Sequence, residues 1–189
     1  MFLKSAASPK DFPGDQGREA AFVGRSNSGK STALNLMVGA RKLARVSKTP
    51  GRTQLVNFFS LGDGRRLVDL PGYGFARAAP EVQARWRSLI ETYLRDRASL
   101  VGLVLTVDIR RGVTELDDQL LRWLESRRAL PVAVLLTKAD KLSRSEGLEV
   151  ERQVKAQLGS SVLVTRFSRE AHEGVEAARG WLDSWLTGT

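Results

Sequence analysis

Short apolar runs alternate along the chain with segments whose apolar residues return at helical spacing. Two runs, 100–107 and 132–136, are apolar almost throughout, which is typical of strands buried on both faces of a parallel sheet. Two others, 54–61 and 65–70, are joined by Gly62-Asp63-Gly64, and an Asp-Gly turn between apolar runs predicts an antiparallel hairpin. The remaining expected strands are the runs at 20–23 and 162–167.

Five segments between these runs show the period of helices that pack one face against a sheet. Pro80 suits the first turn of one of them, while Thr114 and Ser143 precede two others, each with an acidic residue three positions later that completes a capping box. The expected helices are 31–38, about 80–97, the segment after Thr114, the segment after Ser143, and about 173–186.

Strands that alternate with helices predict a three-layer α/β fold. The sheet should have six strands, mostly parallel with one antiparallel edge hairpin, and helices should cover both faces. Residues 1–18 contain prolines and glycines and are expected to form a mostly irregular N-terminal segment, although Phe2 and Leu3 could join the sheet. Residues 19–189 are expected to form one domain.

Composition limits the compartment and the chemistry. The chain has no cysteine, which excludes a disulfide framework and a thiolate metal site. Its longest apolar run, 100–107, is too short to span a bilayer, and the first residues lack the apolar region of a secretory signal. We therefore expect a cytoplasmic protein without a membrane partner, and a monomer.

The charge is strongly basic. There are 30 Lys and Arg against 21 Asp and Glu, giving a formal net charge of +9 and a pI near 10.5. Such a surplus favours a polyanionic partner, with nucleic acid or a ribonucleoprotein first, over the alternative of an ordinary solvated basic surface. The cationic clusters expected to carry it are Arg41, Lys42, Arg45, Lys48 and Arg52, then Arg77, then Arg85, Arg87, Arg95 and Arg97.

The most specific signal lies between the first strand and the first helix. The residues there fit G-x-x-x-x-G-K-S, the phosphate-binding P-loop, in which Gly24 and Gly29 let backbone N–H groups wrap around phosphate oxygens at a helix N-terminus. Lys30 should reach the β- and γ-phosphates, and the Ser31 hydroxyl should bind Mg²⁺. A glycine-rich turn without a ligand is the alternative. The expected nucleotide contacts are Gly24, Arg25, Ser26, Asn27, Ser28, Gly29, Lys30 and Ser31.

A second motif follows the hairpin. Asp69, at the end of a strand, could hold Mg²⁺ through a water molecule, and the Gly72 N–H could bond the γ-phosphate because no side chain blocks its approach. D-x-x-G is weak alone, but it gains weight from its place after a strand that follows a P-loop. The expected contacts are Asp69, Leu70, Pro71 and Gly72.

A third motif indicates which base is bound. The Asp140 carboxylate can accept from N1–H and N2–H₂ of guanine, a pairing that adenine cannot offer, and the aliphatic stem of Lys138 can lie over the base. Ordinary loop chemistry is the alternative for such a short sequence. The expected contacts are Thr137, Lys138, Ala139 and Asp140, with the backbone N–H groups of Phe167, Ser168 and Arg169 covering the base.

Together these motifs resemble the EngB (YihA/YsxC) family of ribosome-assembly GTPases, within the TrmE-Era-EngA-EngB-Septin-like P-loop GTPases. The resemblance spans about residues 2–187. It is carried by Gly-Arg-Ser-Asn-Ser-Gly-Lys-Ser at 24–31, Lys-Thr-Pro-Gly-Arg-Thr-Gln at 48–54, Asp-Leu-Pro-Gly-Tyr-Gly-Phe-Ala at 69–76, Asp-Ile-Arg at 108–110 and Thr-Lys-Ala-Asp at 137–140.

The resemblance implies further site residues. It makes Thr53 a Mg²⁺ ligand, with Thr49 as a rival, and it places two nucleotide-dependent switch segments at 39–53 and 71–79. Asn27 stands where potassium-activated relatives bind a monovalent cation, so K⁺ is a second candidate cation. The additional implied nucleotide contacts are Gly51, Arg52, Thr53 and Gln54, and the residues implied in hydrolysis are Lys30, Thr53, Gly72 and Asn27.

Two positions depart from the Ras pattern. Tyr73 stands where Ras-type enzymes place a water-orienting Gln, and Thr137 replaces the commoner Asn.

The resemblance implies a slow GTPase that binds GTP and GDP and assists assembly of the large (50S) ribosomal subunit, with effects on cell division and septation. A P-loop phosphotransferase, or a cell-division regulator that does not act through the ribosome, is the alternative.

Overall fold

One central strand supplies residues to two hydrophobic layers, one on each side of the sheet. The computed structural model describes residues 1–37, 55–73, 80–126 and 129–188. In strand β2 (Arg18–Gly24), Ala20 and Phe22 pack with helices α1 (Lys30–Met37) and α5 (Val175–Thr187). The alternate residues Ala21 and Val23 pack on the other face, which three more helices cover. The two sets separate because successive strand residues point to opposite faces.

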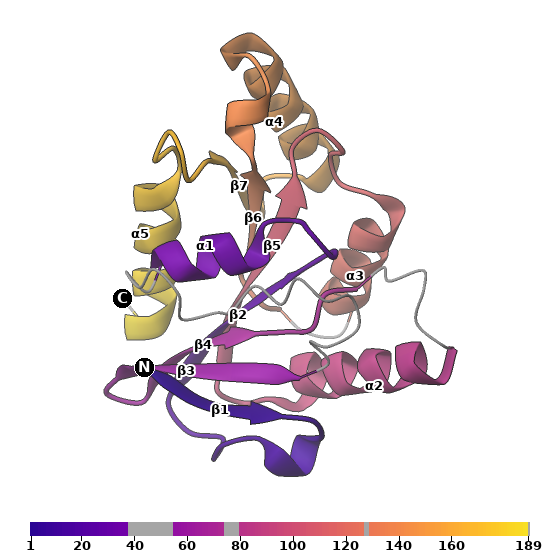
Figure 1. Cartoon of the computed structure of the whole chain (residues 1–189), viewed down its shortest axis with the longest axis vertical. Coiled ribbons are helices and arrows are strands. Elements are labelled where there is room, and N and C mark those ends of the chain that lie inside the picture. The colour runs from indigo at the N-terminus through magenta and orange to yellow at the C-terminus, as the bar shows by residue number, and fades with distance from the viewer. Residues whose placement is uncertain (38–54, 74–79, 127–128, 189) are drawn as a thin grey trace.

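Helices lie on both faces of the sheet, as expected (Figure 1). The face opposite α1 and α5 is covered by α2 (Pro80–Asp96), α3 (Glu115–Glu125) and α4 (Arg144–Leu158). The other strands are β1 (Phe2–Ala6), β3 (Val56–Gly62), β4 (Arg65–Asp69), β5 (Leu100–Asp108), β6 (Val132–Thr137) and β7 (Val162–Phe167), and two short 3₁₀ turns are η1 (Pro9–Asp11) and η2 (Ala139–Lys141).

The strand order reverses direction at β2. The order is β1-β3-β4-β2-β5-β6-β7, with β4, β2, β5, β6 and β7 mutually parallel. After β2 the chain runs to one side through β3 and β4, then crosses to the other side with β5. Ligands of such sheets bind at the carboxyl ends of the strands where the direction reverses, which here is the P-loop.

The sheet has seven strands in the described residues, so the expected count of six is wrong. The added strand comes from the segment expected to be mostly irregular: β1 pairs antiparallel with β3, and Ser5 Oγ donates to Asn57 Oδ1 at 2.6 Å. The Phe2 ring packs edge-on against Phe59 at 5.9 Å between centroids. Phe2 and Leu3 do join the sheet, and β1 covers the hairpin that was expected at the edge.

Candidate nucleotide-binding site

The P-loop joins β2 to α1 and lies tightly against neighbouring strands. A Cβ on Gly24 would be 2.3 Å from Thr106 Oγ1 and 2.6 Å from Ser28 Oγ. Gly29 has a φ of +87°, and a Cβ there would be 3.2 Å from the Thr137 side chain. Both positions therefore require glycine for close approach of the backbone, as the P-loop assignment demands.

Buried hydroxyl groups support this loop from below. Ser28 Oγ lies 2.6 Å from Thr106 Oγ1, and Thr137 Oγ1 donates to Ser28 O at 2.5 Å and lies 3.0 Å from Val107 O. Sequence reasoning did not assign Thr106 a role. The available signal was a hydroxyl group near the end of an otherwise apolar strand. Thr137 stands where the Ras pattern has Asn, and its hydroxyl holds the P-loop to β6.

Lys30 and Asp69 meet at the phosphate end of the site. Lys30 is the first residue of α1, and its ammonium contacts the Asp69 carboxylate at the end of β4. Their side chains are 11% and 6% exposed, so the pair is largely shielded from water. Ser31 follows in the first turn of α1. The fold therefore brings together the residues expected to bind phosphate and Mg²⁺.

Tyr73 joins the segment after β4 to the P-loop. Its N–H donates to Gly24 O at 3.3 Å, and its carbonyl accepts from the Ser26 N–H at 3.1 Å. The preceding Gly72 comes so close to the loop that a Cβ there would lie 3.4 Å from Gly24 O. Within the described residues the Gly72 N–H donates no hydrogen bond, which suits a donor reserved for phosphate.

The side chain of Tyr73 is held by α3. Its hydroxyl donates to the buried Asp117 carboxylate, which also accepts from Thr114 N at 2.8 Å and Thr114 Oγ1 at 2.6 Å. Burial, with the nearby Asp117 charge, raises the pKa of Tyr73 far above its usual value, so the phenol stays protonated and donates. This bond engages the hydroxyl at α3, in keeping with the expectation that position 73 does not orient the attacking water.

The base end of the site centres on Asp140 in η2. Its Oδ1 accepts from Ser168 Oγ at 2.9 Å, and its Oδ2 lies 2.9 Å from Lys141 Nζ. The hydrogen bond from Lys141, helped by Ser168, lowers the pKa of Asp140 below its usual value. The carboxylate is therefore a pure acceptor at neutral pH, which the N1–H and N2–H₂ of guanine require.

One expected base contact is corrected. The Ser168 N–H donates to Glu173 O at 3.1 Å, so it is already used and does not face a base. The Ser168 side chain is fully buried, and its hydroxyl orients Asp140. The role of Ser168 is thus to hold the acceptor in place.

Lys138 spans the gap between the base end and the P-loop. Its Nζ donates to Asn27 O and to Asp108 Oδ2, both at 2.8 Å. Asp108 also accepts two side-chain hydrogen bonds from Arg110, which lower its pKa well below the usual range, with Lys138 adding to the effect. Sequence reasoning noted Asp108 only as part of a family signature. A carboxylate that ends an apolar strand was the signal for its role.

Several expected residues lie outside the described residues. These are Gly51, Arg52, Thr53 and Gln54, the rival Thr49, the whole segment 39–53, residues 74–79 of the second switch segment, and the cations Arg41, Lys42, Arg45, Lys48 and Arg77.

The basic face expected on α2 needs a correction at its last member. Arg97 is 5% exposed and lies just beyond the helix, where its Nη2 and Nε bond the buried Glu19 at 2.7 and 2.9 Å. It is a structural residue and is not available to a polyanion. Arg87 is exposed, and Arg95 is exposed but paired with Asp96 at 2.7 Å.

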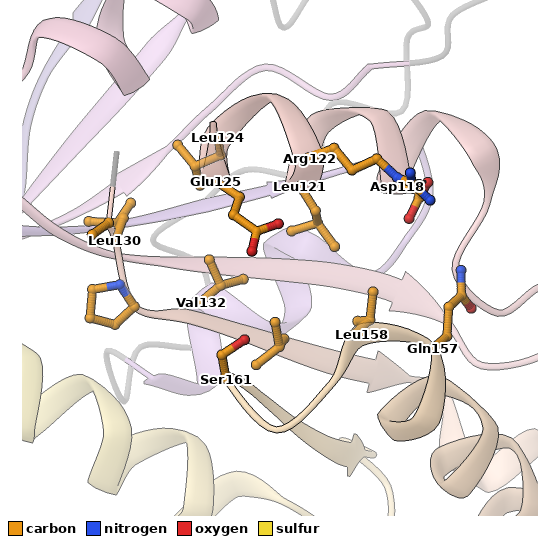
Figure 2. Close-up of a pocket in the computed structure, with 13 residues that line it drawn as sticks. Asp118, Leu121, Arg122, Leu124, Glu125, Leu130, Val132, Gln157, Leu158 and Ser161 are labelled. Atoms are coloured by element: carbon orange, nitrogen blue, oxygen red, sulfur yellow. Dashed lines mark hydrogen bonds and ion pairs between the residues drawn. The ribbon is translucent and has the colours of Figure 1, made fainter. Parts of the chain in front are cut away.

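A separate cavity of about 710 Å³ lies beside α3 (Figure 2). It is bounded by α3, the segment before β6 and the end of α4, at the amino ends of β6 and β7. Its apolar lining includes Leu121, Leu130 and Leu158, with Arg122 and Asp118 at its margin. None of the expected nucleotide contacts lines it.

Comparisons with known proteins agree with this geometry. The sequence profile of a family described as "50S ribosome-binding GTPase" matches residues 19–138. The chain is 48% identical over 190 residues to the probable GTP-binding protein EngB of Azoarcus sp. (strain BH72), covering 98% of this chain and 90% of that protein. The probable GTP-binding protein EngB of Methylococcus capsulatus is 46% identical over 189 residues, with the same two coverages of 98% and 90%. This chain belongs to the EngB family of GTP-binding proteins.

Solved structures support the same assignment. A crystal structure of a probable GTP-binding protein EngB superposes with a TM-score of 0.69 at 25% identity, covering 90% of this chain and 100% of that one. Era of Aquifex aeolicus bound to GDP and AlF₄⁻ shares the fold, with a TM-score of 0.71 at 18% identity, covering 89% of this chain and 56% of that one. As an EngB-family protein the chain is a GTPase with a P-loop fold. No helix in the described part of the chain has the length and apolarity needed to cross a membrane.

Proposed function

We propose that this EngB-family chain is a slow guanine-nucleotide switch that acts in assembly of the large (50S) ribosomal subunit. One observation carries the proposal: the sheet brings Lys30, Asp69 and Gly72 to one side of the P-loop and Lys138 and Asp140 to the other. A triphosphate and a guanine base need these two groups of partners at the two ends of one site.

At the phosphate end, GTP would exchange partners with the protein. The Lys30 ammonium would leave Asp69 for the β- and γ-phosphates, and the P-loop N–H groups would surround the phosphate oxygens at the start of α1. The Gly72 N–H would bond the γ-phosphate, which GDP lacks. This bond would report hydrolysis to residues 71–79, because Gly72 lies within that segment.

At the base end, Asp140 would accept from guanine and Lys138 would lie over the ring. Ser168 fixes the acceptor, and Lys138 is fixed by its contacts with Asn27 O and Asp108. Phe167, Ala139 and Arg169 would complete the walls around the base.

The residues of the phosphate end fit a Mg²⁺ ion. The donors there are the Ser31 hydroxyl and the Asp69 carboxylate, which are oxygen ligands of the kind that Mg²⁺ prefers, with Asp69 acting through water. Thr53 is proposed as the further ligand from the first switch segment. When bound, the ion would supply positive charge that offsets the negative charge of the phosphates.

Tyr73 does not orient the attacking water, so hydrolysis needs another source of transition-state stabilisation. A monovalent cation beside the phosphates would provide it as positive charge. Asn27 is exposed, has a φ of 64°, and its side chain forms no hydrogen bond within the described residues. Its carbonyl is engaged by Lys138, so the amide oxygen of the side chain would be the ligand for K⁺. Positive charge placed at this point stabilises the transition state as an arginine finger does.

The ribosomal partner is supported by the family description and by charge. The matched family is described as ribosome-binding, and the chain carries a net charge of +9. Effects on septation would then follow indirectly, from a shortage of ribosomes. The exposed Arg87 of α2 is one cation that remains open to rRNA phosphates.

Sedimentation with purified large subunits tests this function. We expect co-sedimentation with a non-hydrolysable GTP analogue, much less with GDP or no nucleotide, and a steep loss with salt. Lys30→Met should remove the nucleotide dependence, whereas Lys155→Met, which removes an exposed lysine on α4, should not. Arg87→Glu should weaken sedimentation while GTP binding persists. Binding that ignored nucleotide and salt would contradict the proposal.

A further inference from the structure

The end of β5 carries a carboxylate that the proposed mechanism does not use. The Asp108 side chain is 7% exposed and pairs in register with Thr137 at the end of β6. Its Oδ2 accepts from Lys138 Nζ at 2.8 Å and from Arg110 Nη2 at 2.7 Å, while its Oδ1 accepts from Arg110 Nε at 2.9 Å. A buried carboxylate with two cations is a strong and specific anchor.

Lys138 is the residue that this anchor constrains. It has left-handed backbone angles, φ 59° and ψ 35°, which lysine rarely adopts. Its ammonium is held at two points, Asn27 O and Asp108 Oδ2, and these lie on different elements. Because the head is fixed at both points, the aliphatic stem between Cα and Nζ has a fixed course.

Arg110 completes the arrangement from the solvent side. Its side chain is 49% exposed, and its planar guanidinium grips both carboxylate oxygens of Asp108. The backbone N–H of Arg110 also donates to Asp108 Oδ1 at 3.2 Å. The carboxylate therefore cannot rotate away from Lys138 without breaking several hydrogen bonds.

We propose that Asp108 is a positioning residue, which holds the Lys138 stem where the guanine ring lies and so sets how long the nucleotide stays bound. The inference rests on the base site proposed above. Asp108 acts through Lys138 and the P-loop carbonyl of Asn27, and it makes no contact with the nucleotide itself.

Because the base is common to GTP and GDP, loss of this anchor must weaken both nucleotides by the same factor. A residue that acted at the γ-phosphate would instead change their ratio. This expectation separates Asp108 from Gly72 and Lys30.

The test is nucleotide affinity and dissociation rate for Asp108→Asn, measured with fluorescent GDP and a GTP analogue. We expect both affinities to fall about tenfold, mainly through faster dissociation. Asp118→Asn is the matched control, because it removes the same charge from an exposed pair with Arg122 at 2.7 Å. The control should stay within twofold of the wild type.

A double variant separates positioning from a general structural effect. In a Lys138→Met background there is no ammonium to hold, so adding Asp108→Asn should change affinity less than twofold. A full tenfold effect in that background, or no effect of Asp108→Asn alone, would overturn the inference. Should Asp108→Asn fail to fold, Asp108→Ser can still accept from the Arg110 backbone and carries the same test.

Repeating the measurements on the wild type with a fluorescent ADP and an ATP analogue distinguishes failure of this inference from failure of the proposed site. A wild-type protein that bound adenine and guanine nucleotides equally well would contradict the proposed site. A wild type that binds guanine nucleotides tightly while Asp108→Asn binds them equally well would contradict the positioning role alone.

Discussion

Two buried carboxylates, Glu19 and Asp69, lie at opposite ends of neighbouring strands, and their surroundings differ in kind. Glu19 is the second residue of β2, and Asp69 ends β4, which pairs with β2 in parallel. Both side chains are almost inaccessible, at 0% and 6% exposure. The first lies at the amino end of the sheet, and the second lies at the nucleotide end.

The amino end is closed by fixed partners. Glu19 accepts from Tyr93 OH at 2.8 Å and is paired with Arg97 at 2.7 Å and with Arg66 at 3.0 Å. Arg97 also donates to Pro13 O at 2.8 Å and lies over the ring of Phe12. Every partner comes from packed structure, so this charge can only stabilise the fold.

The nucleotide end is closed by partners that a ligand can replace. Among the described residues Asp69 has one cationic partner, Lys30, and this lysine stands at the start of α1. Burying a charge requires a partner in both cases. The difference lies in how many partners hold it. A single partner can be exchanged for phosphate or a metal ion, whereas three cannot be released together.

The largest effect on stability should come from removing a partner of Glu19 at the amino end of the sheet. Arg97→Met would leave Glu19 buried without its main partner, and we expect the free energy of unfolding to fall by about 3–5 kcal/mol. In a chain of this size that lowers Tm by roughly 6–20 °C, measured by calorimetry. Arg95→Met, which breaks only an exposed pair with Asp96, should leave Tm close to that of the wild type. Equal Tm values for the two variants would refute the comparison.

At the nucleotide end, Asp140→Asn should change specificity with little change in stability. Each charge-assisted bond to guanine contributes roughly 1.5–3 kcal/mol, so we expect GTP affinity to fall about a hundredfold, or about 2.7 kcal/mol. Xanthosine triphosphate, whose ring offers the complementary groups, should gain affinity. Competition binding with both nucleotides checks this. Ser168→Ala, which removes only the hydroxyl that orients Asp140, should weaken GTP and GDP alike by a few fold.

The hydrogen bond from Tyr73 to the buried Asp117 carboxylate gives a third test, in which stability should depend on pH. Tyr73→Phe leaves buried Asp117 one donor short, and we expect a loss of about 1–3 kcal/mol in the free energy of unfolding. The folded state raises the pKa of this phenol above its unfolded value near 10. Its contribution is therefore fully present below pH 10 and is lost above it, by about 1.4 kcal/mol per pH unit. Denaturant melts from pH 8 to 11 should show the difference between wild type and variant shrinking above pH 10, and a constant difference would argue against this bond.

The smallest effect concerns the monovalent cation. We expect hydrolysis to be several-fold faster in K⁺ than in Na⁺ at equal ionic strength, and the difference to vanish in Asn27→Ala. Phosphate-release rates in the two salts measure it. Equal rates for the wild type would show that Asn27 only shapes the loop.

Local patterns predicted the fold well because they act along the chain. The capping residues Thr114 and Ser143 and the apolar run 100–107 each indicate their own element, and the structure has all three. The seventh strand was harder to predict, because residues 2–6 become a strand by pairing with β3 and their composition gives little sign of it.

Functional residues were likewise predictable where a local sequence pattern marks them. The glycines, Lys30 and Asp69 belong to short motifs whose spacing reflects phosphate chemistry. Arg97 was assigned to a basic surface, because its partner Glu19 is 78 residues away in sequence and only the fold brings them together. Long-range pairs of this kind leave no local pattern, so their roles had to come from the structure.

The hydroxyl of Thr137 has a consequence for how such chains diverge. It bonds the main-chain carbonyl of Ser28, so the constraint falls on having a small donor at position 137 and not on a particular partner side chain at position 28. Asparagine also offers a short donor, and a single nucleotide change separates their codons. A single mutation from threonine to asparagine here would therefore still leave a side-chain donor facing the same backbone carbonyl.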